Sequence, residues 1–530
     1  MNDIPSYSEK RLAERWLFLF GLVLLTAAAI WLYFYTTPQG VGLTNDSSAY
    51  LGGARSILRG EGYVRFSGDR LPRPITQFPP LYALKIAAIA GLFNLDVFRA
   101  AWLLNLCCYV LNLLLFSLLI WRLSRSLLAG LAGGVVFLCS GPILQAHVYG
   151  LSEAFSLVFT LVAVWFALEF SEKRRSLPFW LALGVWLGLL MLVRYAGVSV
   201  LIALIVYILA VMPGPKKKLT SAAALLAGAA LPFSLWLLNP ARGTENAVNR
   251  AFTFHFPNAD VLNEGILTLT GYFLPEVFGI LQKTILFWKI FWPILFLAAA
   301  AWLILSFFRR LKREPAEFSV SQQGLFLSAL LALVYLAVLL GVAFFIDGST
   351  VLDNRMLLPF FVFASMFLIL LMADWAARMP KMRLFSLIAV LVFAAFLMED
   401  EVDLIQAFHK DGQGFVGSVW SESETALAAQ ELPQERTFFS NRQTYLWLMK
   451  DMPAYILPAF SDAATQQENA DFQSEKEWLQ RELQSGDAYA IVFNYQDLLE
   501  EQDDRLWMET LFAGMPVYGS YADGMIFGLK

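Results

Sequence analysis

Long segments without charged residues constrain this chain more than any other feature of its sequence. Because the hydrocarbon core of a bilayer is about 30 Å thick, an α-helix needs roughly 17 to 25 apolar residues to cross it. With 58% hydrophobic and 15% charged residues, against about 25% charged in soluble domains, the chain is predicted to be a polytopic α-helical membrane protein. We predict eleven transmembrane helices, of which the last is the shortest: 16–36, 100–121, 126–145, 152–170, 176–193, 195–212, 219–238, 290–308, 324–346, 356–373 and 384–398.

Basic residues indicate how these helices are oriented. A further apolar segment, 79–95, is short, begins with Pro79-Pro80 and contains Lys85. If it does not span, every basic cluster falls on the side of the N terminus, which the positive-inside rule assigns to the cytoplasm. We therefore predict an interfacial or re-entrant helix at 79–95, a cytoplasmic N terminus, and a membrane domain, 1–398, with external loops at 37–99 and 239–289. The clusters lie at 10–15, 122–125, 173–175, 216–218, 309–313 and 378–383.

The C-terminal part of the chain differs in charge and in pattern. Residues 399–530 contain 24 acidic and 8 basic residues, whereas the remainder contains 19 acidic and 31 basic residues. Short apolar segments alternate there with helical patterns, which predicts a small extracytoplasmic α/β domain. Its acidity argues against nucleic-acid binding, and it contains no glycine-rich nucleotide motif. The predicted strands are 437–440, 454–457, 488–493, 516–519 and 525–529, and the predicted helices are 443–450, 471–484 and 495–511.

The segment 44–62, TNDSSAYLGGARSILRGEG, directly follows the first predicted span. Apolar residues recur in it at helical spacing, so it is predicted to form a short amphipathic helix that Gly60 ends. Asp46 lies at the start of this helix, and Arg55 and Arg59 share one side of it because they are four residues apart. An aspartate at this position also suits an N-cap, and the two roles are compatible.

Transfer of a sugar from a phosphate carrier to a hydroxyl requires a base for the hydroxyl proton and positive charge for the departing phosphate. Asp46 is the candidate base. The candidate phosphate ligands are arginines, whose planar guanidinium binds two oxygens at once, namely Arg55, Arg59, Arg194 and Arg355. Arg355 also suits an interfacial anchor, whereas Arg194 lies at an external helix end, where a charge indicates function.

Other polar residues near the predicted external face are further candidates. Glu153 begins the fourth predicted span, where a carboxylate is favoured by the helix dipole as well as by a catalytic role. Lys85, Tyr50 and His255 lie in the external loops and are candidates for substrate binding, although tyrosines there also anchor helices at the interface. The histidines are too scattered to predict a metal site.

With these residues in view, the chain resembles the GT-C superfamily of polyprenyl-phosphate-dependent glycosyltransferases, especially protein O-mannosyltransferases and bacterial aminoarabinose transferases of lipid A. The resemblance implies that Asp46 is the general base, that Glu153 is a secondary acidic residue, and that Arg355, in an Arg-x-x-x-Pro pattern, contacts the donor phosphate. Many relatives have two adjacent acidic residues where this chain has Asn45-Asp46, which weakens the case for a divalent metal; no cofactor is expected. The motifs that carry the resemblance are NDSSAYLGGARSILRGEGY, QFPPLYAL, SEAF, LVRYAGV and DNRMLLPF.

The sequence thus predicts an inverting glycosyltransferase on the external face of a bacterial cytoplasmic membrane. Its partners would be a polyprenyl-phosphate-linked sugar and a lipid, glycan or protein acceptor of the cell envelope. A lipid-linked glycan transporter or flippase is an alternative, but it would need a polar path through spans that are almost free of ionisable groups. A membrane scaffold whose acidic domain binds a partner is another. The enzyme hypothesis requires that Asp46 and Arg355 lie together on the external side.

Overall fold

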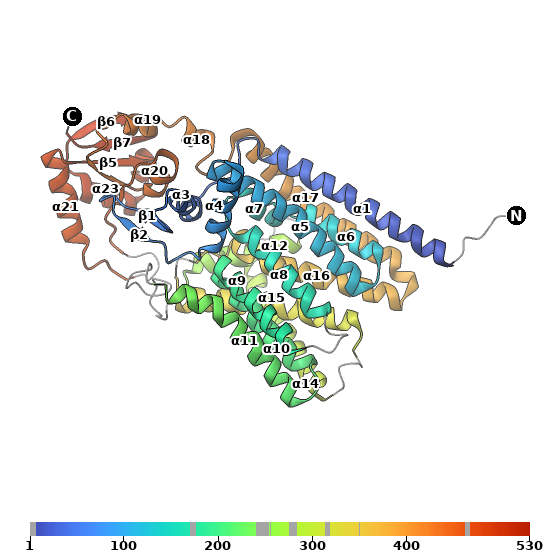
Figure 1. Ribbon diagram of the computed structural model, residues 1–530. Helices are drawn as coiled ribbons and strands as arrows, with labels where there is room; N and C mark the ends of the chain where they lie inside the picture. The colour runs from blue at the N-terminus through green and yellow to red at the C-terminus, as the bar shows by residue number, and fades with distance from the viewer. Residues whose placement is uncertain are drawn as a thin grey trace.

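A computed structural model gives the fold and describes residues 7–169, 176–239, 254, 256–274, 283–312, 318–348, 350–461 and 467–529. The chain forms a bundle of long helices with a small α/β domain at one end (Figure 1). The first of the two predicted external loops, drawn in blue, lies between the bundle and this domain. The predicted fold class is therefore confirmed.

Seven described helices are long and apolar enough to cross a membrane. They are α1 (Tyr7–Thr36), α5 (Val97–Ser124), α11 (Pro215–Leu237), α14 (Ile285–Lys312), α15 (Val320–Phe345), α16 (Asn354–Arg378) and α17 (Arg383–Asp411). A short 3-10 turn, η5 (Pro380–Met382), joins the last two. Each of the seven covers one of the predicted spans, except for the last predicted residue of two spans, 238 and 346. The last is longer than predicted, so the expected domain boundary at residue 399 lies inside α17.

The other four predicted spans coincide with shorter apolar helices. These are α8 (Glu153–Glu169), α9 (Leu177–Val193), α10 (Val198–Val211), and a pair, α6 (Leu127–Leu138) and α7 (Gly141–Val148), that bends by 62° at the break between them. We predicted one helix over 126–145. The break has a physical cause, because Gly141 and Pro142 open α7 and proline disrupts the interior of a helix.

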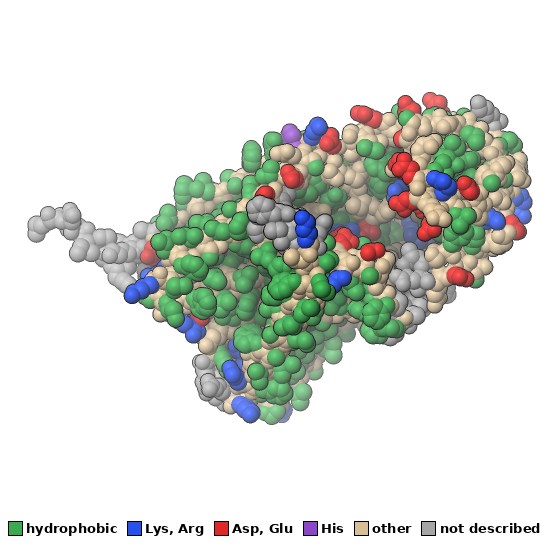
Figure 2. Space-filling model, turned by 180° about the vertical axis from the view of Figure 1, so that it is seen from behind, with side chains coloured by type: hydrophobic (Ala, Val, Ile, Leu, Met, Phe, Trp, Pro, Cys, Tyr) green, Lys and Arg blue, Asp and Glu red, His purple; other side chains and the backbone are tan. Residues whose placement is uncertain are grey.

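The surface of the bundle is apolar. Large hydrophobic side chains are exposed along α1 and α14, including Trp16 at 65% and Leu297 at 71% of their accessible area. Figure 2 shows hydrophobic side chains over the bundle, with acidic side chains gathered at the end that carries the α/β domain. Apolar surface of this extent is unfavourable in water and is expected for a bilayer-embedded protein.

The two long segments predicted to be external fold into short elements between the spans. The first loop contains α2 (Asn45–Ser47), the π-helical turn η1 (Ser48–Gly52), α3 (Gly53–Leu58), β1 (Val64–Phe66), β2 (Pro72–Pro74) and α4 (Leu81–Phe93); α12 (Ala259–Phe273) lies in the second loop, and the 3-10 turn η2 (Tyr195–Gly197) joins α9 to α10. α4 has 13 residues, about 20 Å at 1.5 Å per residue, which is too short to cross the hydrocarbon. Its length therefore fits the predicted interfacial or re-entrant helix.

The C-terminal domain contains a five-stranded mixed sheet in the order β4-β3-β5-β7-β6. β3 pairs in parallel with β4 and β5, whereas β5 and β6 pair antiparallel with β7. The predicted helix over 495–511 is divided into two. The elements are α18 (Ser418–Ser421), α19 (Glu424–Gln430), β3 (Thr437–Ser440), α20 (Gln443–Lys450), β4 (Tyr455–Ile456), α21 (Phe472–Ser485), β5 (Ala488–Phe493), α22 (Tyr495–Leu498), α23 (Gln502–Phe512), β6 (Val517–Tyr521) and β7 (Gly524–Phe527).

The two parts of the molecule share a hydrophobic core. One cluster of buried side chains joins Tyr50 of the first loop and Tyr82 of α4 to Leu446 and Phe438 of the C-terminal domain. Burial of apolar area at this junction contributes about 25 cal/mol per Å². The C-terminal domain is therefore packed onto this first loop.

Candidate active site

Asp46 lies in the first turn of a nearly continuous helical stretch formed by α2, η1 and α3. Thr44 and Ser47 satisfy each other at its start in a capping box. Gly60, with a φ of +79°, lies just beyond its end, as predicted. The π-helical turn at 48–52 was not predicted, and such turns are frequent at functional sites.

The structure brings Asp46 and Arg355 together, as the sequence hypothesis required. Arg355 is the second residue of α16, whose N-cap Asp353 accepts a hydrogen bond from the backbone N–H of Met356. Arg355 Nη2 donates to Asp46 Oδ2 at 2.6 Å. The side chains are 21% and 31% exposed respectively, so a substrate can reach this ion pair.

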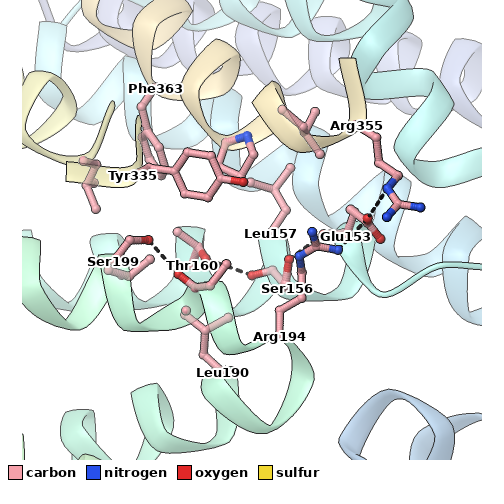
Figure 3. A pocket seen from close by; sticks show the side chains of 16 residues that line it. Glu153, Ser156, Leu157, Thr160, Leu190, Arg194, Ser199, Tyr335, Arg355 and Phe363 are labelled. Atoms are coloured by element: carbon pink, nitrogen blue, oxygen red, sulfur yellow. Dashed lines mark hydrogen bonds and ion pairs between the residues drawn. The ribbon is translucent and has the colours of Figure 1, made fainter. Parts of the chain in front are cut away.

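Glu153 and Arg194 extend the pair inward. Glu153, the first residue of α8, is only 3% exposed, and its Oε1 lies 2.5 Å from Arg194 Nη1 and 3.2 Å from Arg355 Nε. Figure 3 shows the two guanidinium groups on either side of this carboxylate. Asp46, Arg355, Glu153 and Arg194 thus form a four-charge cluster of alternating sign. Such pairing is what allows charges to be buried at low cost.

A small cavity adjoins the inner side of the four-charge cluster (Figure 3). Its volume is about 30 Å³, which is room for one or two water molecules. Tyr335 lines it and donates from its hydroxyl to the carbonyl of Met356 at 2.6 Å. A sugar does not fit there. A substrate must therefore reach the cluster from the more exposed side, where Asp46 lies.

Arg55 and Arg59 are not part of the four-charge cluster. Arg59 makes two hydrogen bonds to the carboxylate of Asp451, at 2.8 and 3.3 Å, and Arg55 lies 3.4 Å from the same carboxylate. The hydrogen bond from Arg59 lowers the pKa of Asp451. Both arginines contact the C-terminal domain because their face of α3 packs against it, and their role in phosphate binding stays a prediction.

Of the remaining predicted binding residues, Tyr50 lies beside the four-charge cluster, where it interacts electrostatically with Arg194, Glu153 and Asp46. Tyr50 is buried at 3% exposure, and its hydroxyl is hydrogen-bonded to that of Ser152 at 2.9 Å. Burial raises its pKa, so the hydroxyl stays neutral and supports the helix beside Glu153. Lys85 is exposed on α4, on a face away from the buried side of that helix. His255 lies outside the described residues.

The described residues do not assemble a group of three or more histidine, cysteine, aspartate or glutamate side chains able to hold a metal ion. The oxygens nearest Asp46 are already engaged, since Oδ1 of Asn45 accepts a hydrogen bond from Thr444 and Glu153 contacts two arginines. This donor set does not fit a divalent metal site.

A second cavity lies within the bundle, between α12, α14, α15 and α16. Its volume is about 570 Å³ and its wall is almost entirely apolar. α16 contributes Phe360, Ala364 and Phe367 to this wall and carries Arg355 at its N-terminal end. At 1.5 Å per residue, Phe360 lies about 8 Å further along the helix than Arg355. α16 therefore extends from the apolar cavity to Arg355, a side chain of the type that binds phosphate.

Comparisons with known proteins agree with this architecture. Residues 77–238 match the family described as dolichyl-phosphate-mannose-protein mannosyltransferase. ArnT from Cupriavidus metallidurans superposes with a TM-score of 0.53 at 14% identity, covering 97% of this chain and 98% of ArnT. The oligosaccharyltransferase AglB from Archaeoglobus fulgidus, solved with an inhibitory peptide and a dolichol-phosphate, gives 0.57 at 12% identity over 99% and 75% of the chains.

The arabinofuranosyltransferase AftD from Mycobacteria gives a TM-score of 0.51 at 14% identity, over 96% of this chain and 40% of AftD. A search of curated proteins finds no match to the sequence. Identities this low show a shared fold. The chain is thus a multi-pass membrane protein with the GT-C fold, the fold of these membrane glycosyltransferases, and the predicted resemblance is confirmed.

Proposed function

We propose that this GT-C-fold protein is an inverting glycosyltransferase that moves a sugar from a polyprenyl-phosphate donor to a hydroxyl group of a cell-envelope acceptor. The single observation that carries the proposal is the pairing of Asp46 with Arg355 at an accessible point of the membrane domain. This pair supplies both groups that the reaction needs, a base and a cation for the leaving phosphate.

The chemical step uses the pair as follows. The acceptor hydroxyl attacks the anomeric carbon, and its proton passes to the carboxylate of Asp46. The bond between that carbon and the phosphate oxygen breaks, and its electron pair stays on the phosphate, whose charge Arg355 stabilises. Before donor binds, Arg355 is held by Asp46 at 2.6 Å. A donor phosphate competes with Asp46 for this guanidinium and so releases the carboxylate to act as a base.

The apolar cavity beside α16 supports a lipid-linked donor. Its volume of about 570 Å³ suits several isoprene units, and its wall offers almost no polar partners. Each buried CH₂ group contributes about 0.8 kcal/mol, so a polyprenyl chain there would provide much of the binding energy. The head group would then meet Arg355 at the external end of the same helix.

The location of the reaction follows from charge. In the predicted topology the basic clusters fall at the ends of spans opposite to Asp46 and the α/β domain, and the positive-inside rule assigns such clusters to the cytoplasm. We therefore assign the N terminus to the cytoplasm, and the active site and C-terminal domain to the external face of a bacterial cytoplasmic membrane. Cysteines introduced into the two ends of α16 and labelled from outside the cell test this orientation.

The proposal is tested by donor binding and transfer with purified protein in lipid nanodiscs. We expect Arg355→Gln to weaken binding of polyprenyl phosphate about 10- to 100-fold, because a charge-assisted hydrogen bond contributes about 1.5–3 kcal/mol. Arg378→Gln is the matched control, since Arg378 lies at the other end of α16 and is 62% exposed. Equal binding by both variants, or no sugar transfer by the wild type from any polyprenyl-phosphate sugar offered, contradicts the proposal.

A further inference from the structure

The C-terminal domain contacts the side chain next to Asp46. Thr444, in the first turn of α20, donates from Oγ1 to Oδ1 of Asn45 at 2.6 Å. Asn45 is the first residue of α2, so this hydrogen bond fixes the turn that carries Asp46. The bond joins residues 399 positions apart and is therefore a tertiary contact, with no local structural purpose in α20.

The same helix packs closely on the π-helical turn that follows Asp46. A Cβ atom added to Gly52 would lie 2.5 Å from the indole ring of Trp447, so only glycine permits this approach. Trp447 is 6% exposed and forms a small buried cluster with Ala49 and Ile75. The indole ring thus sets the distance between the π-helical turn and the surface of the C-terminal domain.

Arginines of the first loop hold the other end of α20. Arg55 donates to the carbonyls of Trp447 and Leu448, at 2.7 and 3.1 Å, and both Arg55 and Arg59 contact Asp451. Carbonyls in the last turn of a helix have no partner within it, and cations are favoured there by the helix dipole. These contacts explain why the loop carries two arginines that do not reach the four-charge cluster.

The backbone before Asp46 is held on both sides. Leu43 N–H donates to the carbonyl of Gln413, and Phe415 N–H donates to the carbonyl of Leu43 at 2.9 Å. On its other side, Gly42 is bridged to the segment at 148–150 of the membrane domain. A Cβ on Gly414 would lie 1.8 Å from the carbonyl oxygen of Leu43. The linker into the C-terminal domain is thus fitted closely to the strand that leads into α2.

We propose that the C-terminal domain positions the general base, with Thr444 and Trp447 as positioning residues that act through Asn45 and Gly52. The effect of this positioning on the rate of sugar transfer rests on the proposed function. A shift of about 1 Å in a reacting group costs on the order of 10²-fold in rate, and the short helix that carries Asp46 lies in a connection between two spans. Contacts from α20 reach both sides of Asp46 along the chain, which is the arrangement that fixes its carboxylate against Arg355.

The test is a mutant cycle on the Thr444–Asn45 hydrogen bond in the full-length protein. We expect Thr444→Val to lower kcat about five- to tenfold, the value of a neutral hydrogen bond, without changing KM for the donor. Thr444→Ser keeps the hydroxyl and should restore the rate. Because both residues act through one bond, Asn45→Ala combined with Thr444→Val should be no slower than the slower single variant. Thr510→Val is the control, since Thr510 bonds within its own helix, α23.

A second measurement is independent of activity. Hydrogen–deuterium exchange of the backbone amides at 42–52 should be faster in Thr444→Val and Trp447→Ala than in wild type, and unchanged in Thr510→Val. A wild-type rate in Thr444→Val, no rescue by serine, additive effects in the double variant, or unchanged exchange would each overturn the positioning role. If wild-type protein transfers no sugar while exchange responds as expected, the proposed function fails and the domain contact stands.

Discussion

Replacement of Glu153 by glutamine removes one negative charge from the middle of the four-charge cluster. Glu153 Oε1 forms ion pairs with Arg194 Nη1 at 2.5 Å and with Arg355 Nε at 3.2 Å, in a site where Glu153 is only 3% exposed. Glutamine preserves shape and a carbonyl acceptor. The substitution therefore tests charge and leaves packing nearly unchanged.

The expected loss of stability follows from these two contacts. A hydrogen bond to a charged group contributes about 1.5–3 kcal/mol and a neutral one about 0.5–1.5 kcal/mol, so each contact loses about 1 kcal/mol or slightly more. Two arginines would then share the single carboxylate of Asp46. We expect Glu153→Gln to lose about 2–3 kcal/mol of stability, and Glu153→Ala about 3–5 kcal/mol, the cost of breaking a buried ion pair.

Activity should fall as well, because Glu153 anchors the Nε side of Arg355. Removing a charge-stabilising donor costs about 10² to 10³ in kcat, and a displaced Arg355 should cost toward the lower end of that range. Thermal unfolding followed by the fluorescence of the 16 tryptophans measures stability, and transfer from a polyprenyl-phosphate sugar measures rate. Glu264→Gln, at an exposed position of α12, is the control.

A Glu153→Gln protein with the stability and rate of wild type would refute this reasoning. It would mean that the arginines need no buried counter-ion and that Glu153 does not orient Arg355. Loss of rate without loss of stability would favour direct participation of Glu153 in catalysis, as the family resemblance implied, over the positioning role that its burial supports.

Two further predictions concern the lipid cavity and the domain contact. Ala364→Phe narrows the cavity and should weaken binding of a long polyprenyl phosphate about tenfold, the contribution of about two buried CH₂ groups. Binding of a short-chain analogue should not change. Ala298→Phe, at an exposed position of α14, is the control, and equal losses for both chain lengths would argue against the cavity as the lipid site. Asp451→Asn should lower thermal stability by an amount that is constant from about pH 5 to 8 and shrinks as the pH falls below about 4. Arg59 lowers the pKa of Asp451 in the folded protein, so the stabilisation is lost only as that carboxyl is protonated. A stability difference that persists in acid would show that the ion pair is not its cause.

The sequence was sufficient for the membrane domain because hydropathy reports a local property. Each predicted span corresponds to an apolar helix, and the error at 126–145 arose where Gly141-Pro142 interrupts a uniformly apolar segment. The contact between Asp46 and Arg355 was also within reach. Arg355 directly precedes a predicted span and Asp46 lies in the loop that follows another, on the same predicted face, where opposite charges are expected to pair.

The fate of Arg55 and Arg59 could not be predicted in this way. Their partner, Asp451, is one of 24 acidic residues after position 398, and nothing in the local sequence distinguishes it. The contact depends on how α20 docks on the first loop, over a separation of 392 residues. The roles of Thr444 and Trp447 could not be predicted for the same reason, since they depend on contacts with Asn45 and Gly52 across the domain boundary.

The central claim is that the carboxylate of Asp46 takes the acceptor proton while Arg355 binds the donor phosphate. Single-turnover transfer by Asp46→Asn, measured with donor binding on the same preparation, tests it most directly. We expect transfer to fall about 10²- to 10⁴-fold, the contribution of a general base, while polyprenyl phosphate binds as tightly as to wild type or more tightly, because Arg355 has lost its competing partner. Transfer at the wild-type rate by a folded Asp46→Asn protein, or donor binding that is lost together with the carboxylate, would contradict the account.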